Sequence, residues 1–235
     1  MYTMKQRVRY SETDHTKHLT LTGIVNYFQD CSTFQSEDIG VGIEFLEAHK
    51  RGWVLSSWQI VVKRYPKIGE YVEISTWPTE FHGLYGTRNF VLKDEKGEIL
   101  AYANSIWVFM DMGKGRPTKP TEEEIAAYQI EPKLEMDYAP RKLMLPEEWE
   151  QRPSFPVRKA QIDTNGHVNN SRYIEMALEL LPKEMFLGQI RVEYKKSAVY
   201  GDIMYPMIHE DEKSTIVKLC DKDGQLFAAV EFTGE

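Results

Sequence analysis

Residues 163–170 read Asp-Thr-Asn-Gly-His-Val-Asn-Asn and lead directly into a stretch whose apolar residues have helical spacing. This segment places a carboxylate, carboxamides and an imidazole in one turn, and such groups can hold a reactive carbonyl. A weaker copy, Asp-His-Thr-Lys-His-Leu, occupies residues 14–19 and also precedes an amphipathic stretch. The two copies predict a duplicated fold.

Two further pairs of segments support the duplication. Residues 59–70 begin Gln-Ile-Val-Val-Lys-Arg and end Gly-Glu, whereas residues 191–202 begin Arg-Val-Glu-Tyr-Lys-Lys and end Gly-Asp. Residues 92–97, Leu-Lys-Asp-Glu-Lys-Gly, match residues 219–224, Leu-Cys-Asp-Lys-Asp-Gly. Because the order is the same in both halves, each copy is predicted to contain a turn, a helix, a strand and then hairpins.

The composition fits a compact enzyme. The chain has 235 residues, of which 42% are hydrophobic and 12% aromatic, enough to bury a core in two units. Its net charge of −7 argues against a nucleic-acid partner. We expect no membrane partner and a cytoplasmic location, because no apolar run approaches the ~20 residues that span a bilayer and the N-terminus lacks an apolar signal core. Cys31 and Cys220 have no metal-ligand spacing, so we expect core thiols, no metal site and no cofactor.

Periodicity predicts one long helix in each copy, followed by antiparallel strands. The expected elements are helices over 20–38, 45–50, 122–128 and 170–181, the last stopped by Pro182, and strands over 54–74, over 84–110 and from Gln189 onward. Prolines concentrate between residues 111 and 157, which indicates a linker. The predicted organisation is an N-terminal unit at 1–130, a linker at 131–157 and a C-terminal unit at 158–235.

A helix wrapped by an antiparallel sheet that follows it in sequence is an α+β arrangement. It is similar to the hotdog fold, and two copies would make a double hotdog whose sheets join around two central helices. A closer resemblance rests on two sets of residues. They are Asp163, Asn165, His167–Asn170, Tyr173 and Glu193–Lys196 in the second half, and Trp53, Pro66–Trp77, Gly86–Arg88, Leu92–Asp94, Ser105–Val108 and Asp111 in the first. In these residues the chain resembles the acyl-acyl carrier protein (acyl-ACP) thioesterases.

The resemblance implies hydrolysis of acyl-ACP to free fatty acid and carrier in fatty acid biosynthesis. It also implies that the N-terminal unit binds the acyl chain and that the C-terminal unit is catalytic. An acyl-CoA thioesterase, a hotdog dehydratase and a non-catalytic acyl-binding protein remain as alternatives. A duplicated chain already contains two hotdog units, so either a monomer or a homodimer is expected.

The chemistry of the second turn points to the same reaction. An imidazole with an ordinary pKa near 6.5 suits His167 as a general base, and the carboxylate of Asp163 is positioned either to orient it or to bind water. The amide of Asn165 can donate to a developing oxyanion. We expect Asn169 and Asn170 to cap the following helix, and the Asp14 turn to be only structural.

One departure from the family concerns the nucleophile. Plant members carry a Glu-Cys pair where this chain has Ser197 and Ala198. The missing cysteine favours water as the nucleophile. Ser197 either positions that water or is an ordinary strand serine. Glu193, expected on the same strand face, is either a supporting carboxylate or a surface or cross-strand charge pair.

The carrier protein of this family is strongly acidic, so its docking surface should be basic. Four candidate pairs are Lys63 with Arg64, Arg141 with Lys142, Arg158 with Lys159, and Lys195 with Lys196. The tryptophans at 53, 58, 77 and 107 are expected in the core, where some could line an acyl tunnel.

Overall fold

The computed structural model describes residues 1–181 and 186–234, and it divides into two compact units. The first unit comprises Met1–Leu55 and Ile60–Tyr138, and the second comprises Ser56–Gln59 and Ala139–Glu235. The boundary at residues 138–139 lies inside the segment predicted as a linker.

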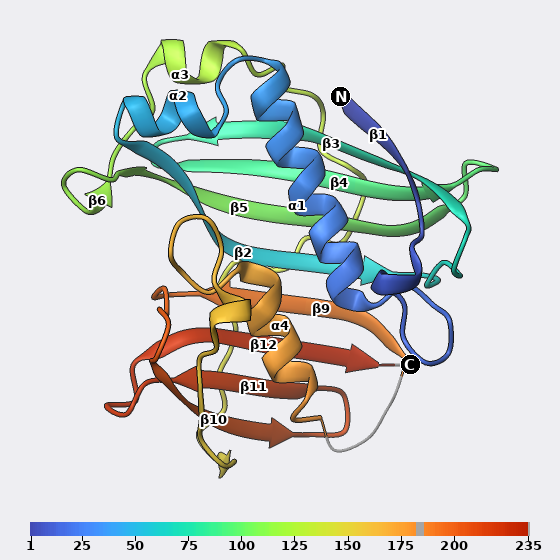
Figure 1. Cartoon of the computed structure of the whole chain (residues 1–235), viewed down its shortest axis with the longest axis vertical. Coiled ribbons are helices and arrows are strands. Elements are labelled where there is room, and N and C mark those ends of the chain that lie inside the picture. The colour runs from blue at the N-terminus through green and yellow to red at the C-terminus, as the bar shows by residue number, and fades with distance from the viewer. Residues whose placement is uncertain (182–185, 235) are drawn as a thin grey trace. The chain divides into compact units, whose positions relative to one another are not determined.

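The first unit is one long helix on an antiparallel sheet (Figure 1). Its elements are β1 (Tyr2–Arg7), α1 (Leu21–Asp38), α2 (Ile43–Ala48), β2 (Arg51–Val62), β3 (Tyr71–His82), β4 (Tyr85–Asp94), β5 (Ile99–Asp111), β6 (Arg116–Pro117) and α3 (Glu122–Ala126). The strand order is β1-β3-β4-β5-β2, with β6 paired to β5, and α1 packs against β1 and β3. All three predicted helices of this half are confirmed.

The sequence explains the bounds of α1. The Thr20 side chain caps the helix by accepting a hydrogen bond from Gly23 N at 3.0 Å. The helix ends at Asp38, two residues before Gly40, whose φ of 79° is left-handed. The predicted apolar face is buried except at Phe34, which is 48% exposed. Gln35 takes the inward position in the last turn, because it lies nearer the line of buried residues on the helix surface.

The second unit repeats this arrangement with a shorter helix. Its elements are β7 (Glu150–Gln151), β8 (Phe155–Pro156), α4 (Asn170–Leu178), β9 (Leu187–Tyr194), β10 (Ile203–Glu210), β11 (Thr215–Cys220) and β12 (Leu226–Gly234). The strand order is β9-β12-β11-β10-β7, with β8 also paired to β10, and α4 packs against β11 and β12. The predicted helix begins at Asn170 as expected and ends at Leu178. Its proposed stop, Pro182, lies outside the described residues.

Backbone hydrogen bonds confirm the duplication position by position. Each turn motif is closed by the N–H of its aspartate donating to the carbonyl of its histidine, at 2.9 Å in the first copy and 2.8 Å in the second. In the first copy the N–H groups of Lys63 and Arg64 donate to Leu100 O, and in the second those of Lys195 and Lys196 donate to Phe227 O. The hairpin turns also correspond, because Gly97 N donates to Asp94 O and Gly224 N donates to Asp221 O.

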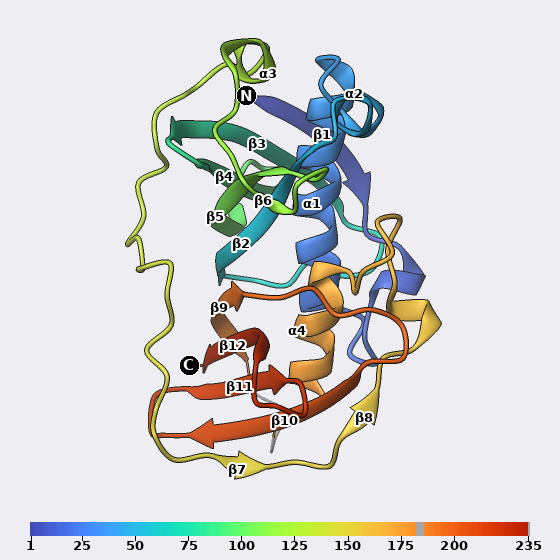
Figure 2. The ribbon, with the colours of Figure 1, turned by 90° about the vertical axis from the view of Figure 1, so that its left-hand side faces the viewer.

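The segment predicted as a linker is held by the sheets at several points. Figure 2 shows the extended chain between α3 and β7. In the first unit, Trp77 Nε1 donates to Pro132 O at 2.9 Å and Leu134 N donates to Asn89 Oδ1 at 3.0 Å. In the second unit, β7 and β8 pair with β10. This segment therefore contributes strands and hydrogen bonds rather than acting as a free tether.

Candidate active site

The turn before α4 is organised by the carboxylate of Asp163. Its Oδ1 accepts hydrogen bonds from Asn165 N at 2.8 Å and His167 N at 3.4 Å, while Asp163 N donates to His167 O at 2.8 Å. Gly166 has a φ of 77°, a left-handed conformation that glycine adopts without strain. Asp163 therefore holds both the N–H and the carbonyl of His167 in place.

Of the two asparagines predicted to cap α4, Asn169 does so and Asn170 does not. Asn169 Oδ1 accepts hydrogen bonds from Ser171 N and Ser171 Oγ, each at 2.9 Å. Asn170 is the first helical residue, and its carbonyl accepts a hydrogen bond from Tyr194 Oη at 2.9 Å. The Ser171 N–H is therefore already satisfied by the cap and is not available to a ligand.

Ala198 joins the turn to the loop after β9. Its carbonyl accepts a hydrogen bond from Val168 N at 2.8 Å, and its N–H donates to Tyr173 Oη at 2.8 Å. Ala198 is fully buried, and the ring of Tyr173 packs edge-on against that of Tyr194 at 5.8 Å. Burial raises the pKa of Tyr173 to about 12, so its hydroxyl is protonated at neutral pH.

Three polar groups of the turn are left available. Within residues 1–181 and 186–234, the Asn165 carboxamide, the His167 imidazole and Asp163 Oδ2 have no hydrogen-bond partner. Asn165 is exposed, and Asp163 and His167 are half-buried. The structure thus brings the three predicted residues together in one turn and leaves an acceptor, an amide donor and an imidazole for substrate and water.

The turn of the first copy has the same backbone hydrogen bonds, but its histidine ring already has a hydrogen-bond partner. Asp14 Oδ1 accepts hydrogen bonds from Thr16 N at 2.8 Å, Thr16 Oγ1 at 2.6 Å and His18 N at 3.2 Å. Thr16 Oγ1 also lies 2.9 Å from His18 Nδ1. Lys17 adopts the left-handed conformation with a φ of 67°, where the second copy has glycine. This bonding supports the interpretation of the first turn as structural.

Glu193 and Ser197 do not share a strand face, and that prediction is wrong. β9 ends at Tyr194, so Ser197 lies in the following loop, where it is exposed. Glu193 is only 3% exposed. Its Oε1 lies 2.6 Å from Lys195 Nζ, and its Oε2 accepts a hydrogen bond from Leu143 N at 3.1 Å. Glu193 is therefore a buried carboxylate that holds Leu143 to the sheet, neither a surface group nor half of a cross-strand pair.

The two thiols are confirmed as core residues. Cys31 and Cys220 are both free and buried, and Cys31 Sγ lies 3.5 Å from Ile74 O. Burial raises the pKa of Cys31 to about 12 and also raises that of Cys220. In the described part of the chain no cluster of three His, Cys, Asp or Glu side chains could hold a metal. None of its helices is long and apolar enough to cross a membrane.

A buried arginine in the first unit was not foreseen. Arg88 on β4 is 8% exposed, donates to Gln35 of α1 and to Thr76 Oγ1 at 3.2 Å, and lies 5.7 Å from the ring centre of Tyr128. Burial lowers its pKa to about 10. The sequence marked Arg88 only through the family resemblance, because periodicity does not distinguish a buried guanidinium from an exposed one.

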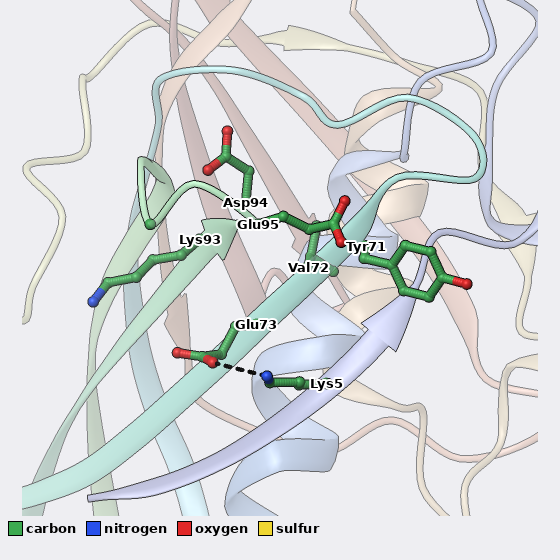
Figure 3. A pocket seen from close by; sticks show the side chains of 8 residues that line it. Lys5, Tyr71, Val72, Glu73, Lys93, Asp94 and Glu95 are labelled. Atoms are coloured by element: carbon green, nitrogen blue, oxygen red, sulfur yellow. Dashed lines mark ion pairs between the residues drawn. The ribbon is translucent and has the colours of Figure 1, made fainter.

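The first unit also has a surface hollow of about 290 Å³ (Figure 3). It is lined by Lys5, Tyr71, Val72, Glu73, Lys93, Asp94, Glu95 and Gly97. Figure 3 shows Lys5 and Glu73 facing each other, with their charged atoms 4.0 Å apart. A lining with this many charges does not suit a hydrocarbon chain, so this hollow is not the acyl site.

Comparison with known proteins identifies the family. Residues 1–128 match the acyl-ACP thioesterase N-terminal domain, and residues 146–230 match the acyl-ACP thioesterase C-terminal domain. The chain belongs to the acyl-ACP thioesterase family. This membership confirms the resemblance predicted from the Asp163 turn and the tryptophan-rich first half.

Individual members of the acyl-ACP thioesterase family agree with this result. The chloroplastic oleoyl-ACP thioesterase of Coriandrum sativum is 28% identical over 98% of this chain and 69% of its own length. The acyl-[acyl-carrier-protein] hydrolase FATB3 of Cuphea viscosissima is 30% identical, over 80% of this chain and 50% of its own length. The crystal structure of an acyl-ACP thioesterase from Bacteroides thetaiotaomicron has a TM-score of 0.90 at 24% identity, covering 99% of this chain and 97% of that one. The α+β double hotdog fold is confirmed, as is a thioester hydrolase acting on acyl-ACP at the level of the family.

Proposed function

We propose that this chain releases fatty acid from acyl-ACP by direct attack of water, with Asp163, Asn165 and His167 as the reacting groups. Family membership supports the reaction. The observation that carries the residue assignment is the contrast between the two copies. The same backbone frame engages His18 through Thr16 in the first copy and leaves His167 and its neighbours available in the second.

His167 serves as the general base in this proposal. The thioester carbonyl is already electrophilic, so the enzyme must position a water, remove its proton and stabilise the oxyanion. The imidazole takes the proton as the water oxygen bonds to the carbonyl carbon. It returns that proton to sulfur as the C–S bond breaks, and the carrier leaves as a thiol.

Asn165 and Asp163 have complementary tasks. The exposed carboxamide of Asn165 donates a hydrogen bond to the carbonyl oxygen as negative charge develops there. Asp163 contacts the backbone N–H of His167 rather than its ring. Of the two predicted tasks for Asp163, this geometry favours binding water through Oδ2 over orienting the imidazole.

The surroundings of Ala198 support water as the nucleophile. Position 198 is fully buried, and its N–H and carbonyl hold the turn through Tyr173 and Val168. The residue therefore has a structural task here, and its methyl group offers no nucleophile. Ser197 is exposed, and its hydroxyl has no hydrogen-bond partner among the described residues, which leaves it free to bind water.

The test is thiol release from acyl-ACP and acyl-CoA substrates with short to long chains. His167→Ala and Asn165→Ala should each lower turnover about a hundredfold or more while the protein stays folded. His18→Ala is the matched control and should keep near wild-type turnover. Near-full activity in both folded second-copy variants would refute the assignment. Tight acyl binding without thiol release from the wild-type protein would indicate the non-catalytic alternative.

Location and assembly remain predictions. A cytoplasmic enzyme that is either a monomer or a homodimer is consistent with the presence of both hotdog units in one chain. Cell fractionation would test the location, and sedimentation of the purified protein would test its assembly.

A further inference from the structure

We infer that Arg158 and Lys159, together with the exposed side chains of Val199 and Tyr200, form the surface that docks the acidic face of the carrier protein. This docking patch flanks the Asp163 turn. The inference rests on the proposed function, since it assigns the surface by which the acyl-ACP substrate reaches that site.

The four candidate basic pairs differ in whether their side chains already have partners within the protein. Arg64 already pairs with Glu70 at 3.0 Å and with Asp94 at 3.5 Å. Arg141 NH1 donates to Ser56 Oγ at 3.0 Å. Each of these pairs therefore has a member that the protein itself engages.

The two remaining pairs differ sharply. Lys195 and Lys196 lie 2.6 Å and 3.1 Å from the carboxylates of Glu193 and Asp221, respectively. Arg158 and Lys159 are both exposed, and neither has a carboxylate partner within residues 1–181 and 186–234. This is the pair whose charge is most available to a partner.

The second step is a difference between the two copies. In the first copy, Arg9 lies 3.9 Å from the carboxylate of Glu12, and Tyr10 follows it. In the second copy the residue equivalent to Glu12 is the neutral Gln161, whose Oε1 accepts a hydrogen bond from the backbone N–H of Arg158 at 2.7 Å. Lys159 replaces the tyrosine. At these two positions the first copy has an ion-paired arginine and a neutral tyrosine, whereas the second copy has two cations that lack a carboxylate partner among the described residues.

The third step is the connection to that site. Lys159 Nζ lies 5.5 Å from the ring centre of Tyr200, which is 58% exposed, and Val199 is 43% exposed. Gly201 N donates to Val157 O at 3.3 Å, which ties this loop to the segment before Arg158. The same loop contains Ala198, which is bonded to the Asp163 turn. A partner seated on the patch therefore lies next to the reacting groups.

The chemistry of the patch fits a protein with an acidic surface. Two cations without a carboxylate partner among the described residues, beside an exposed aromatic and an exposed aliphatic side chain, match the usual mixture at a docking site. The chain as a whole carries a net charge of −7, so an acidic partner would be repelled elsewhere and guided toward a local basic patch. Asp202 Oδ2 accepts a hydrogen bond from Val199 N at 2.9 Å, and among the described residues Asp202 forms no ion pair with Arg158 or Lys159.

The experiment compares Lys159→Glu with Lys213→Glu in the full chain. Lys213 is an exposed lysine in the turn between β10 and β11. It precedes the first residue of β11, whereas Asp221, the partner of Lys196, follows the last. Both variants make the same change in charge. The substrates are acyl-ACP, the matching acyl-CoA and the matching acyl-N-acetylcysteamine, which is an uncharged thioester. Affinity for the holo-carrier is measured by calorimetry.

We expect Lys159→Glu to lower kcat/KM for acyl-ACP about tenfold or more through KM, to weaken holo-carrier binding in parallel, and to leave the uncharged thioester unchanged. Lys213→Glu should change each value less than about twofold. Unchanged holo-carrier binding and unchanged kcat/KM for acyl-ACP in Lys159→Glu would overturn the inference. A larger loss with acyl-CoA than with acyl-ACP would also overturn it, because the patch would then recognise phosphates. If the wild-type protein releases no thiol, the proposed function fails, and the calorimetry still decides the docking patch.

Discussion

The substitution Asn165→Thr tests the site with a residue that the fold already accepts in the same place. In the first copy, Thr16 donates to Asp14 at 2.6 Å and lies 2.9 Å from His18 Nδ1. A threonine at 165 should make the same two contacts with Asp163 and His167. The threonine would remove the Asn165 amide that we assign to oxyanion stabilisation, and its hydroxyl would form a hydrogen bond with the His167 imidazole.

The two expected effects have different sizes. Loss of an oxyanion donor costs about 10²–10³ in kcat, or roughly 3–4 kcal/mol. The added hydroxyl gains one hydrogen bond to a carboxylate, so the free energy of unfolding should stay the same or rise by up to about 1.5 kcal/mol. Activity should therefore fall at least a hundredfold in a protein that is no less stable than wild type.

The assay combines thiol release from acyl-ACP with urea unfolding followed by tryptophan fluorescence. The matched control is Thr16→Asn, which makes the reverse exchange in the first copy and should leave kcat within about twofold of wild type. If folded Asn165→Thr keeps more than about a third of wild-type kcat, the role of Asn165 and the importance of a free imidazole are both refuted.

Two further predictions concern the buried groups. Tyr173→Phe leaves the buried N–H of Ala198 without its acceptor, so urea unfolding should show a loss of about 1–3 kcal/mol; an unchanged midpoint would mean that this bond does not hold the loop. The raised pKa values of Cys31 and Cys220 predict no reaction of the native protein with Ellman's reagent at pH 8 and two equivalents after denaturation. Rapid labelling of the native protein would contradict their burial.

Local pattern was sufficient for most of the fold. The apolar spacing after residue 20 predicted α1 almost to the residue, because a buried helical face is a local feature. The strand after Trp53 and the Asp94–Gly97 turn follow from β-branched runs and a glycine with φ of 83°. Phe34 was misplaced because its apolar character suggested the inward position of the last turn, which the polar Gln35 occupies instead.

The candidate site was predictable for a related reason. Asp163, Asn165 and His167 lie within five residues, so a single turn brings them together without any long-range packing. Glu193 and Arg88 differ in this respect. Their burial depends on segments distant in sequence, such as the backbone of Leu143 beside Glu193, and no local pattern contains that information.

Comparison of the two copies separates the shared backbone structure of the turn from the side chains that differ between them. Both copies close the same turn around an aspartate and a histidine, so this backbone arrangement does not distinguish them. Three of the differences between the copies concern the turn and its flank: Asn165 replaces Thr16, Gly166 replaces the left-handed Lys17, and Lys159 replaces Tyr10. The first difference frees an amide and an imidazole, the second removes a long side chain from the turn, and the third adds positive charge beside it. All three favour binding of an acyl thioester on an acidic carrier at the second turn, so reverting any one of them should cost activity while the shared frame keeps the protein folded.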